Sequence, residues 1–545
     1  MDNRTFIDVI FSNTSLGHRI LDNLSFLNLR YVFYIVSPYE STYARYEDVP
    51  NYNVEVGTWF LVLFLLEFAI LWIQGIRDRH ELNDTITSMS AVILSQIFKF
   101  GGRTIAIYGY LLIWNNFRVL ELPWDSPWTW LLTLLTQDFL YYVGHRAVHE
   151  AGFLWALHAI HHSSEYYNLS TALRQAAIQD VGLMWFDMLQ AFFIPPQIFL
   201  VHRYFNEVFQ FWLHTSLVGS LGPFGEVFNT PSYHRVHHGR NPYCIDKNYG
   251  AVFIIWDKMF GTFERERGDD PPIYGLVTNV KSFNQLWLQF SVFKEILYDK
   301  VWMKDEEGKD VFPGIRNKIK AALYPPGYFP GKKTKFFFHW YCLEDPKDGV
   351  PEVEMPVHKY NPQIPLWIKL YCIGHFLMLL SIYFHFEHDR FSLSYVDFTL
   401  QVAFIVYTMQ CFGAFFDNVP YASYLELSRC ALVFGYHCYL TTDVYGPRPS
   451  RIFALTIWML SSLLWAGYIA QLFVSKIQDD NATKVHPKKQ TIKAAEEGQA
   501  KSEPIETVSA RVAEAELFDR QVNAQVAGAS DRETGVQDSA VSVRL

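Results

Sequence analysis

The segment WTWLLTLLTQDFLYYVGHRAVHE (residues 128–150) is apolar over most of its length and ends in two histidines, His145 and His149. On an α-helix, a spacing of four residues puts both imidazoles on one face, one turn apart. Two later segments, HAIHH (158–162) and HRVHH (234–238), each carry histidines at positions i, i+3 and i+4, which also share a helical face. We therefore expect each triplet to direct three imidazoles to one point.

These histidines have the chemistry of a metal site. Neutral imidazole binds iron, zinc, copper and nickel, and eight imidazoles are too many for one ion, which takes about four to six ligands. The sequence therefore predicts two metal ions. The predicted ligands are His145, His149, His158, His161, His162, His234, His237 and His238.

Other histidines have weaker signals. His214 stands alone on an apolar segment, where it is either a metal ligand or a hydrogen-bonded structural histidine. His202 is followed by Arg203 and is expected at a solvated or interfacial position. The remaining histidines, such as His375 and His437, have no ligand-like grouping, except that His385 and His388 lie three residues apart near a helix end, where they are expected to be interfacial.

Carboxylates also lie near the histidines in the sequence. Glu150 directly follows His149 and is either a solvated loop carboxylate or a polar group that supports the site. Asp138 lies two helical turns before the first histidine. A carboxylate within an apolar helix is costly unless it has a polar partner, so Asp138 could orient a histidine. Asp180 and Asp187 allow a similar but vaguer interpretation.

The composition is that of a membrane protein, with 50% hydrophobic, 17% aromatic and 19% charged residues. Residues 54–73 are long enough to cross a bilayer, and Glu67 within them is expected to face protein or water. The apolar segments together predict an all-α, polytopic membrane protein with about nine passes. They are residues 54–73, 86–113, 128–143, a hairpin of 183–201 and 206–221 around Pro195 and Pro196, 366–386, 395–416, 423–442 and 452–474.

The orientation and the division of the chain follow from charge and composition. Arg77 and Arg79 favour a cytosolic loop after the first span, and counting passes from there puts the histidine-rich di-metal site at the cytosolic membrane face. The last part of the chain has few aromatic residues and is expected to be disordered. We expect an N-terminal segment (1–50), a membrane domain with the histidines (51–265), a polar cytosolic region (266–365), C-terminal membrane helices (366–475) and a disordered tail (476–545).

Several classes of function are disfavoured. A net charge of −9 does not suit a protein that binds nucleic acid. Six cysteines without a CxxC pair argue against a disulfide framework or a thiolate zinc site. No GxGxxG fingerprint follows a strand, so the chain is not expected to hold its own flavin or nicotinamide. A metal transporter would carry histidines near the bilayer midplane, whereas these lie at helix ends, which favours an enzyme.

The three boxes, HxxxH, HxxHH and HxxHH, resemble those of the fatty acid hydroxylase superfamily of membrane di-metal oxygenases. The wording of HRAVHE (145–150), WALHAIHHSSEYYNLSTALRQ (155–175) and NTPSYHRVHHGRNPYCIDKNYGAVFIIWDKMFGTF (229–263) resembles the alkylglycerol monooxygenase family within it. The resemblance implies an endoplasmic reticulum enzyme that uses two iron ions, O2 and tetrahydrobiopterin. Such an enzyme hydroxylates the carbon next to the ether oxygen of a membrane alkylglycerol, and the hemiacetal collapses to a fatty aldehyde and a glycerol. A pterin-recycling system is then an implied partner.

The resemblance also implies roles for single residues. In the family the eight histidines and the glutamate after the second histidine are required, which makes Glu150 the expected catalytic residue. Some related hydroxylases have a further HxxxH on the fifth helix, where this chain has Gln210 and His214, so the ligand status of His214 stays open. The residues Tyr166, Tyr167, Asn168 and Tyr249 either line a pterin or headgroup pocket or are interfacial.

One alternative remains within the superfamily. A sterol or sphingolipid hydroxylase or desaturase would carry the same boxes, and only the box wording and the apolar segments after residue 366 argue against it.

Overall fold

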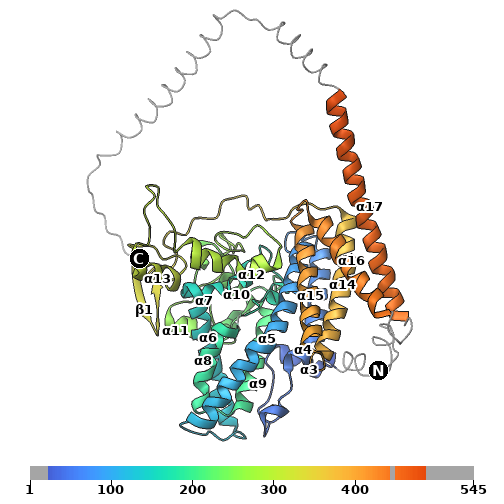
Figure 1. Ribbon diagram of the computed structural model, residues 1–545. Helices are drawn as coiled ribbons and strands as arrows, with labels where there is room; N and C mark the ends of the chain where they lie inside the picture. Colours follow the sequence, from blue (N-terminus) through green and yellow to red (C-terminus); the bar gives the residue numbers. More distant parts are fainter. Residues whose placement is uncertain (1–22, 179, 442–448, 486–545) are drawn as a thin grey trace, which may run out of the picture. The chain divides into compact units, whose positions relative to one another are not determined.

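Long α-helices form most of the protein (Figure 1). The structure, a computed structural model, describes residues 23–178, 180–441 and 449–485. Its contacts divide the chain into two units, residues 1–465 and 466–545. The α-helices up to the second triplet are α3 (Phe26–Val32), α4 (Tyr52–Ile73), α5 (Leu82–Phe117), α6 (Pro127–Glu150), α7 (Gly152–Ala156), α8 (Asp180–Asp187), α9 (Pro196–Leu213) and α10 (Pro231–His237). The later elements are α11 (Ile255–Phe260), α12 (Gln285–Lys294), α13 (Gly314–Leu323), β1 (Thr334–Phe337), β2 (Trp340–Leu343), α14 (Leu366–Asp389), α15 (Tyr395–Phe416), α16 (Ala422–Thr441) and α17 (Pro449–Val485).

Helix α6 is the expected helix that leads into the first two histidines. Pro127 occupies its first turn, where a missing backbone N–H costs no helical hydrogen bond. Several leucines on its first half are exposed, whereas every residue from Tyr141 to Glu150 is buried. The protein therefore encloses the end of α6 that carries the histidines.

Fewer helices fit a membrane span than the sequence predicts. Among the described residues, four helices are long and apolar enough to cross a membrane, judged by length and composition. They are Tyr46–Ile73, Leu366–Asp389, Tyr395–Phe416 and Ile452–Gln478. The other expected passes include helices α5 and α16, which carry buried acidic side chains such as Asp84 and Glu426. The predicted cytosolic position of the histidines stays a prediction.

The expected hairpin around the two prolines has different boundaries from those predicted. Its first arm is α8 followed by the 3-10 helix Met188–Phe192, and its second arm is α9, which begins at Pro196 and ends at Leu213. The predicted arms, 183–201 and 206–221, are wrong because Pro196 begins the second helix. His214 consequently follows the last residue of α9 as its C-cap.

Glu67 on α4 faces protein, as expected for a carboxylate in an apolar helix. Its side chain accepts hydrogen bonds from Leu169 N (2.6 Å) and from Thr215 Oγ1 (2.6 Å). Those two residues lie close in sequence to the first triplet and to His214. Glu67 thus connects a candidate membrane span to the segment after the first triplet and to the residue after His214.

The region 266–365, predicted to be polar, contains a two-stranded antiparallel sheet. Strand β1 pairs with β2 so that Phe337 lies opposite Trp340, and Phe338 and His339 form the turn between them. Strand β2 packs on α6, which brings this region to the helix that carries the first two histidines.

Helix α15 packs on α14, on α16 and on α5. A buried polar network connects them. Arg429 of α16 donates to His375 Nδ1 of α14 (3.0 Å) and to Thr408 Oγ1 of α15 (3.3 Å). His375, which has no ligand-like grouping in the sequence, is therefore a member of a structural hydrogen-bond network.

Helix α17 continues to Val485, so the first residues of the predicted tail (476–545) are helical. Most of that predicted tail, residues 486–545, lies outside the described residues, as do residues 1–22 of the predicted N-terminal segment.

Candidate metal centre

Four short pieces of backbone bring nine histidines together. The last turns of α6 carry His145 and His149, and the C-cap of α9 is His214. His158 precedes the 3-10 helix Ala159–His162, which carries the rest of the first triplet. The second triplet lies on α10 and its C-cap. All nine side chains are buried.

The nine histidines form two groups. Within each group, one ring nitrogen of every histidine lies within 4.8 Å of the others. The five-histidine group is His145, His149, His158, His162 and His237, and the four-histidine group is His161, His214, His234 and His238.

The expectation that each triplet converges on one point is wrong. The first triplet gives its i and i+4 histidines to the five-histidine group and its i+3 histidine to the other group, and the second triplet does the reverse. Consecutive residues on a helix point about 100° apart, which follows from ~3.6 residues per turn. On the 3-10 helix that carries His161 and His162 the angle is about 120°. Adjacent histidines, His161 and His162 or His237 and His238, therefore reach different groups.

The spacing of the inner nitrogens suits metal ligation. In the five-histidine group, His158 Nε2 lies 3.3 Å from the Nε2 atoms of both His145 and His162. In the four-histidine group, His214 Nε2 lies 3.2 Å from His161 Nε2 and 3.1 Å from His234 Nε2. Two imidazole nitrogens that each lie about 2.0–2.1 Å from one ion are separated by roughly 3.0–3.4 Å.

Other inner nitrogens lack any protein partner. The Nε2 atoms of His149, His237 and His238 are buried and have no hydrogen bond. A buried nitrogen without a partner is costly unless something else binds it. The donor set and the spacing of the nitrogens therefore fit one metal ion in each group.

Backbone carbonyls orient four of the rings. The partners are Tyr249 O for His145 Nδ1 (2.8 Å), Arg174 O for His161 Nδ1 (3.1 Å), Gln210 O for His214 Nδ1 (2.8 Å) and Lys247 O for His237 Nδ1 (2.9 Å). A carbonyl only accepts, so each Nδ1 carries the proton. The lone pair of Nε2 then points into the group, as in many histidine–metal sites.

Burial keeps the triplets neutral. Burial lowers the pKa of His161 to about 4. Burial, and then the neighbouring histidines, lower the pKa of the other triplet members, His158, His162, His234, His237 and His238, well below the usual range. Neutral imidazole is the form that binds a metal, so the triplets are in the ligand form at neutral pH.

Arg174 supports the four-histidine group, a role that sequence reasoning missed. Its carbonyl accepts from His161, and its guanidinium pairs with Asp84 and donates to Ser88 Oγ (3.1 Å) on α5. The sequence signal was an arginine shortly after the first triplet, but its acidic partner, Asp84, lies far away in sequence.

Asp138 does not orient a histidine. Its carboxylate accepts from the backbone N–H groups of Val252 and Phe253 (2.8 and 3.0 Å), from Trp256 Nε1 (2.9 Å) and from Asn206 Nδ2 (3.0 Å). The carboxylate thus fixes the segment after the second triplet to α6.

Two further sequence-based interpretations change. Asp180 and Asp187 both face Arg203, at 3.5 and 3.0 Å, and not the histidine groups. His202 is fully buried instead of solvated, and its Nδ1 lies 2.6 Å from the hydroxyl of Tyr34. Packing of the N-terminal segment on α9 accounts for this burial.

Glu150 is 3% exposed, so its interpretation as a solvated loop carboxylate is wrong. It accepts from Arg146 Nε (2.9 Å) and from Trp340 Nε1 (3.0 Å). Asp246 also lies near the five-histidine group, with Oδ1 3.9 Å from His149 Nδ1, and sequence reasoning missed it. Burial, and then the nearby Glu150, raise the pKa of Asp246 to about 7.

The four residues considered for a pterin or headgroup pocket, Tyr166, Tyr167, Asn168 and Tyr249, are all buried. The Tyr167 hydroxyl donates to Leu213 O (2.9 Å), and its ring stacks on His214 with centroids 5.9 Å apart. Asn168 donates to Arg79 O (2.8 Å). Tyr249 has a buried hydroxyl without a hydrogen bond, and its ring centroid lies 5.3 Å from that of His149.

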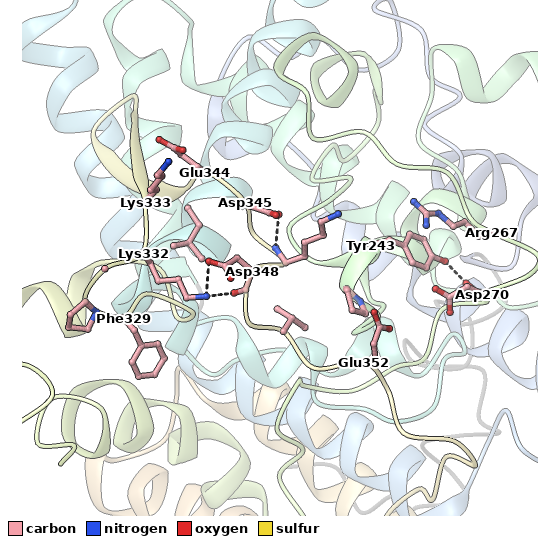
Figure 2. A pocket seen from close by; sticks show the side chains of 16 residues that line it. Tyr243, Arg267, Asp270, Phe329, Lys332, Lys333, Glu344, Asp345, Asp348 and Glu352 are labelled. Atoms are coloured by element: carbon pink, nitrogen blue, oxygen red, sulfur yellow. Dashed lines mark hydrogen bonds and ion pairs between the residues drawn. The ribbon is translucent and has the colours of Figure 1, made fainter. Parts of the chain in front are cut away.

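A surface pocket of about 950 Å³ lies elsewhere. Figure 2 shows its mixed lining of charged side chains, among them Arg267, Asp270, Lys332 and Asp348. None of the nine histidines lines it, so this pocket is separate from the candidate metal centre.

Comparison with known proteins agrees with this geometry. The fatty acid hydroxylase family profile matches residues 130–262, the part that contains all nine histidines. The profile of the alkylglycerol monooxygenase C-terminal domain matches residues 368–450. No solved structure matches the chain.

Individual relatives are similar over most of the chain. An alkylglycerol monooxygenase of Caenorhabditis elegans is 57% identical over 91% of this chain and 98% of its own length. Those of Xenopus tropicalis and Homo sapiens are 40% and 39% identical, over 76% and 74% of this chain and 89% and 86% of their own lengths. The chain, a helical membrane enzyme with two histidine groups that can hold metal, therefore belongs to the alkylglycerol monooxygenase family.

Proposed function

We propose that this enzyme is a di-iron monooxygenase that depends on tetrahydrobiopterin and oxidises O-alkylglycerol lipids. The observation that carries the proposal is the pair of histidine groups, with five and four convergent donors. The similarity to alkylglycerol monooxygenases over most of the chain supports the choice of substrate. The ligands are the eight predicted histidines together with His214.

The proposed reaction inserts one atom of O2 into the C–H bond next to the ether oxygen. The second oxygen atom leaves as water, which takes two electrons, supplied by the pterin, and two protons. The product is a hemiacetal, in which the C–O bond to glycerol then breaks to give a fatty aldehyde and a free glycerol hydroxyl. Iron held by the histidines would activate O2 for attack on the unactivated C–H bond, a chemistry that protein side chains alone lack.

The protein contributes ligands and a closed environment. The backbone carbonyls that accept from Nδ1 orient the rings, and burial of all nine histidines excludes bulk water from the two groups. Exposed leucines on the first half of α6 face the lipid in this proposal, so an alkyl chain can approach the site from the bilayer.

Location and domain roles belong to the same proposal. We place the enzyme in the endoplasmic reticulum membrane, with the histidines at the cytosolic face, where a soluble pterin and its recycling system have access. Residues 51–265 form the catalytic membrane domain, residues 266–365 the cytosolic region, and residues 366–475 the C-terminal membrane helices.

The test is turnover of a labelled alkylglycerol by membranes that contain the full chain, with and without tetrahydrobiopterin. Aldehyde formed only with the pterin is the expected result. Membranes with the His161→Ala variant are the control and should form none. Absence of aldehyde with metal-loaded wild type, but oxidation of a sterol or sphingolipid, would replace the substrate assignment and keep the di-metal oxygenase.

A further inference from the structure

The β1–β2 hairpin packs on the end of α6 that carries His145 and His149. The contact joins residues 190 positions apart in the chain, Glu150 and Trp340. The hairpin belongs to the region 266–365, which the sequence predicts to be a polar cytosolic region. Its contact with α6 therefore requires a separate explanation.

The hairpin holds a buried carboxylate. The indole N–H of Trp340 donates to Glu150 Oε2 (3.0 Å), and Arg146 Nε donates to Glu150 Oε1 (2.9 Å). Because each oxygen has a different donor, the plane of the carboxylate is fixed. One donor, Trp340, belongs to the hairpin. The other, Arg146, contacts it, because its guanidinium carbon lies 3.7 Å from the ring centroid of Phe337 in β1.

This carboxylate lies beside the five-histidine group. Arg146 and Glu150 each follow a histidine of α6, so they form the neighbouring stripe of the same helix. Glu150 also lies near Tyr249 and Asp246, and both of these residues lie close to His149.

His149 lacks a hydrogen bond that two other rings of its group have. His145 and His237 each have an Nδ1 bonded to a backbone carbonyl. The Nδ1 of His149 instead has Asp246 Oδ1 at 3.9 Å, which is beyond hydrogen-bond distance. The orientation of His149 consequently relies on the last turn of α6 and on the side chains packed around it.

The hairpin turn is strained. Phe338 has a φ of 49°, a left-handed conformation that is unfavourable for a bulky side chain and is normally taken by Asn or Gly in two-residue hairpin turns. Its ring packs over that of Trp340, with centroids 6.3 Å apart. Strain of this kind persists where surrounding contacts enforce it, and it is common at functional sites.

We propose that Trp340 is a positioning residue of the active site, which fixes Glu150 through its indole N–H and thereby supports the last turn of α6 and His149. The β1–β2 hairpin is then part of the catalytic unit. The effect on turnover rests on the proposed function, whereas the contact itself does not.

The first experiment compares Trp340→Phe with wild type in the purified full-length enzyme. Phenylalanine keeps an aromatic ring and removes only the donor. We expect kcat to fall roughly tenfold or more, the loss that follows from one hydrogen bond to a charged group. The KM for the lipid and the metal content per chain should stay at wild-type values.

Trp302→Phe is the matched control. Trp302 belongs to the same region and lies under Lys318, whose Nζ is 4.2 Å from the ring centroid. This variant should keep the wild-type kcat. If Trp340→Phe keeps the wild-type kcat, or if its metal content falls in proportion to kcat, Trp340 is not a positioning residue and the proposal is overturned.

The second experiment detects the contact without turnover. In Glu150→Gln, backbone hydrogen exchange measured by mass spectrometry should rise in residues 334–343 and stay unchanged in α13. Unchanged exchange in the hairpin would contradict the contact on which the proposal rests.

The two experiments separate this proposal from the proposed function. If wild type oxidises no alkylglycerol but another lipid, the proposed function fails, and the comparison of Trp340→Phe with wild type is made on that other lipid. The exchange experiment decides about the hairpin contact in either case.

Discussion

Glu426 and Arg429 are an ion pair one turn apart on α16, and both side chains are only 1% exposed. The guanidinium donates to the carboxylate (Nε to Oε2, 2.9 Å) and to His375 Nδ1 of α14. The carboxylate also accepts from Tyr371 on α14. A buried pair of charges in an apolar bundle is tolerated only when each group is bonded in this way.

Removal of one partner from this pair should destabilise the protein strongly. Glu426→Ala leaves a buried guanidinium uncompensated, which costs about 3–5 kcal/mol. Unfolding by denaturant titration in detergent micelles measures the loss. Glu387→Ala is the matched control, since Glu387 and Arg390 on α14 have the same spacing but are 26% and 20% exposed. We expect a loss of about 0–1 kcal/mol there, and equal losses in the two variants would contradict the network.

Loss of one histidine should affect one group and stop the reaction. Removal of His237 takes a donor from the five-histidine group, and removal of His161 takes one from the four-histidine group. Each alanine variant should insert into membranes, lose roughly one of two ions per chain and form no aldehyde. Metal analysis of purified protein and turnover are the measurements. His385→Ala, at an exposed histidine of α14, should retain both ions, and full turnover by either variant would exclude the metal-site assignment.

A comparison of two buried histidines decides the role of His214. Its Nε2 faces the nitrogens of His161 and His234, so His214→Ala should lower the metal content and abolish activity. His202 is equally buried but bonds to Tyr34 outside both groups. His202→Ala should reduce the thermal midpoint and keep the metal. A full metal complement in His214→Ala would make this residue structural.

Removal of metal should loosen the segments that carry the histidines. Buried nitrogens without partners, such as His238 Nε2, are unfavourable without an ion, and metal binding stabilises the folded state. Treatment with a chelator should lower the thermal midpoint and raise hydrogen exchange in residues 158–162 and 231–238. Added Fe²⁺ should reverse both changes. Unchanged exchange in these two segments after complete removal of metal would contradict the assignment.

The sequence predicted much of the site because its signals are local. The spacing of His145 and His149 defines one face of a helix, and the structure places both in one group. The same reasoning failed for the triplets, since adjacent residues on a helix point in different directions, and His161 and His162 accordingly belong to different groups. Glu67 was correctly expected to face protein, because a carboxylate in an apolar helix requires polar partners.

Contacts between distant segments were beyond the sequence. Asp138 was a candidate to orient a histidine, but it binds the backbone of Val252 and Phe253 instead. The partner of Glu150, Trp340, lies 190 residues away. Spacing along the chain gives no information about such pairs.

The sequence by itself determined the chemistry: imidazoles sufficient for two metal ions, at the end of an apolar helix, in a chain with further membrane helices. Only the tertiary structure decided how the nine histidines divide into groups of five and four, that His214 joins the second group, and that a hairpin from the polar region holds Glu150. The physical reason is that local spacing fixes the direction of a side chain from its own helix, whereas the point where side chains from different segments meet depends on how those segments pack.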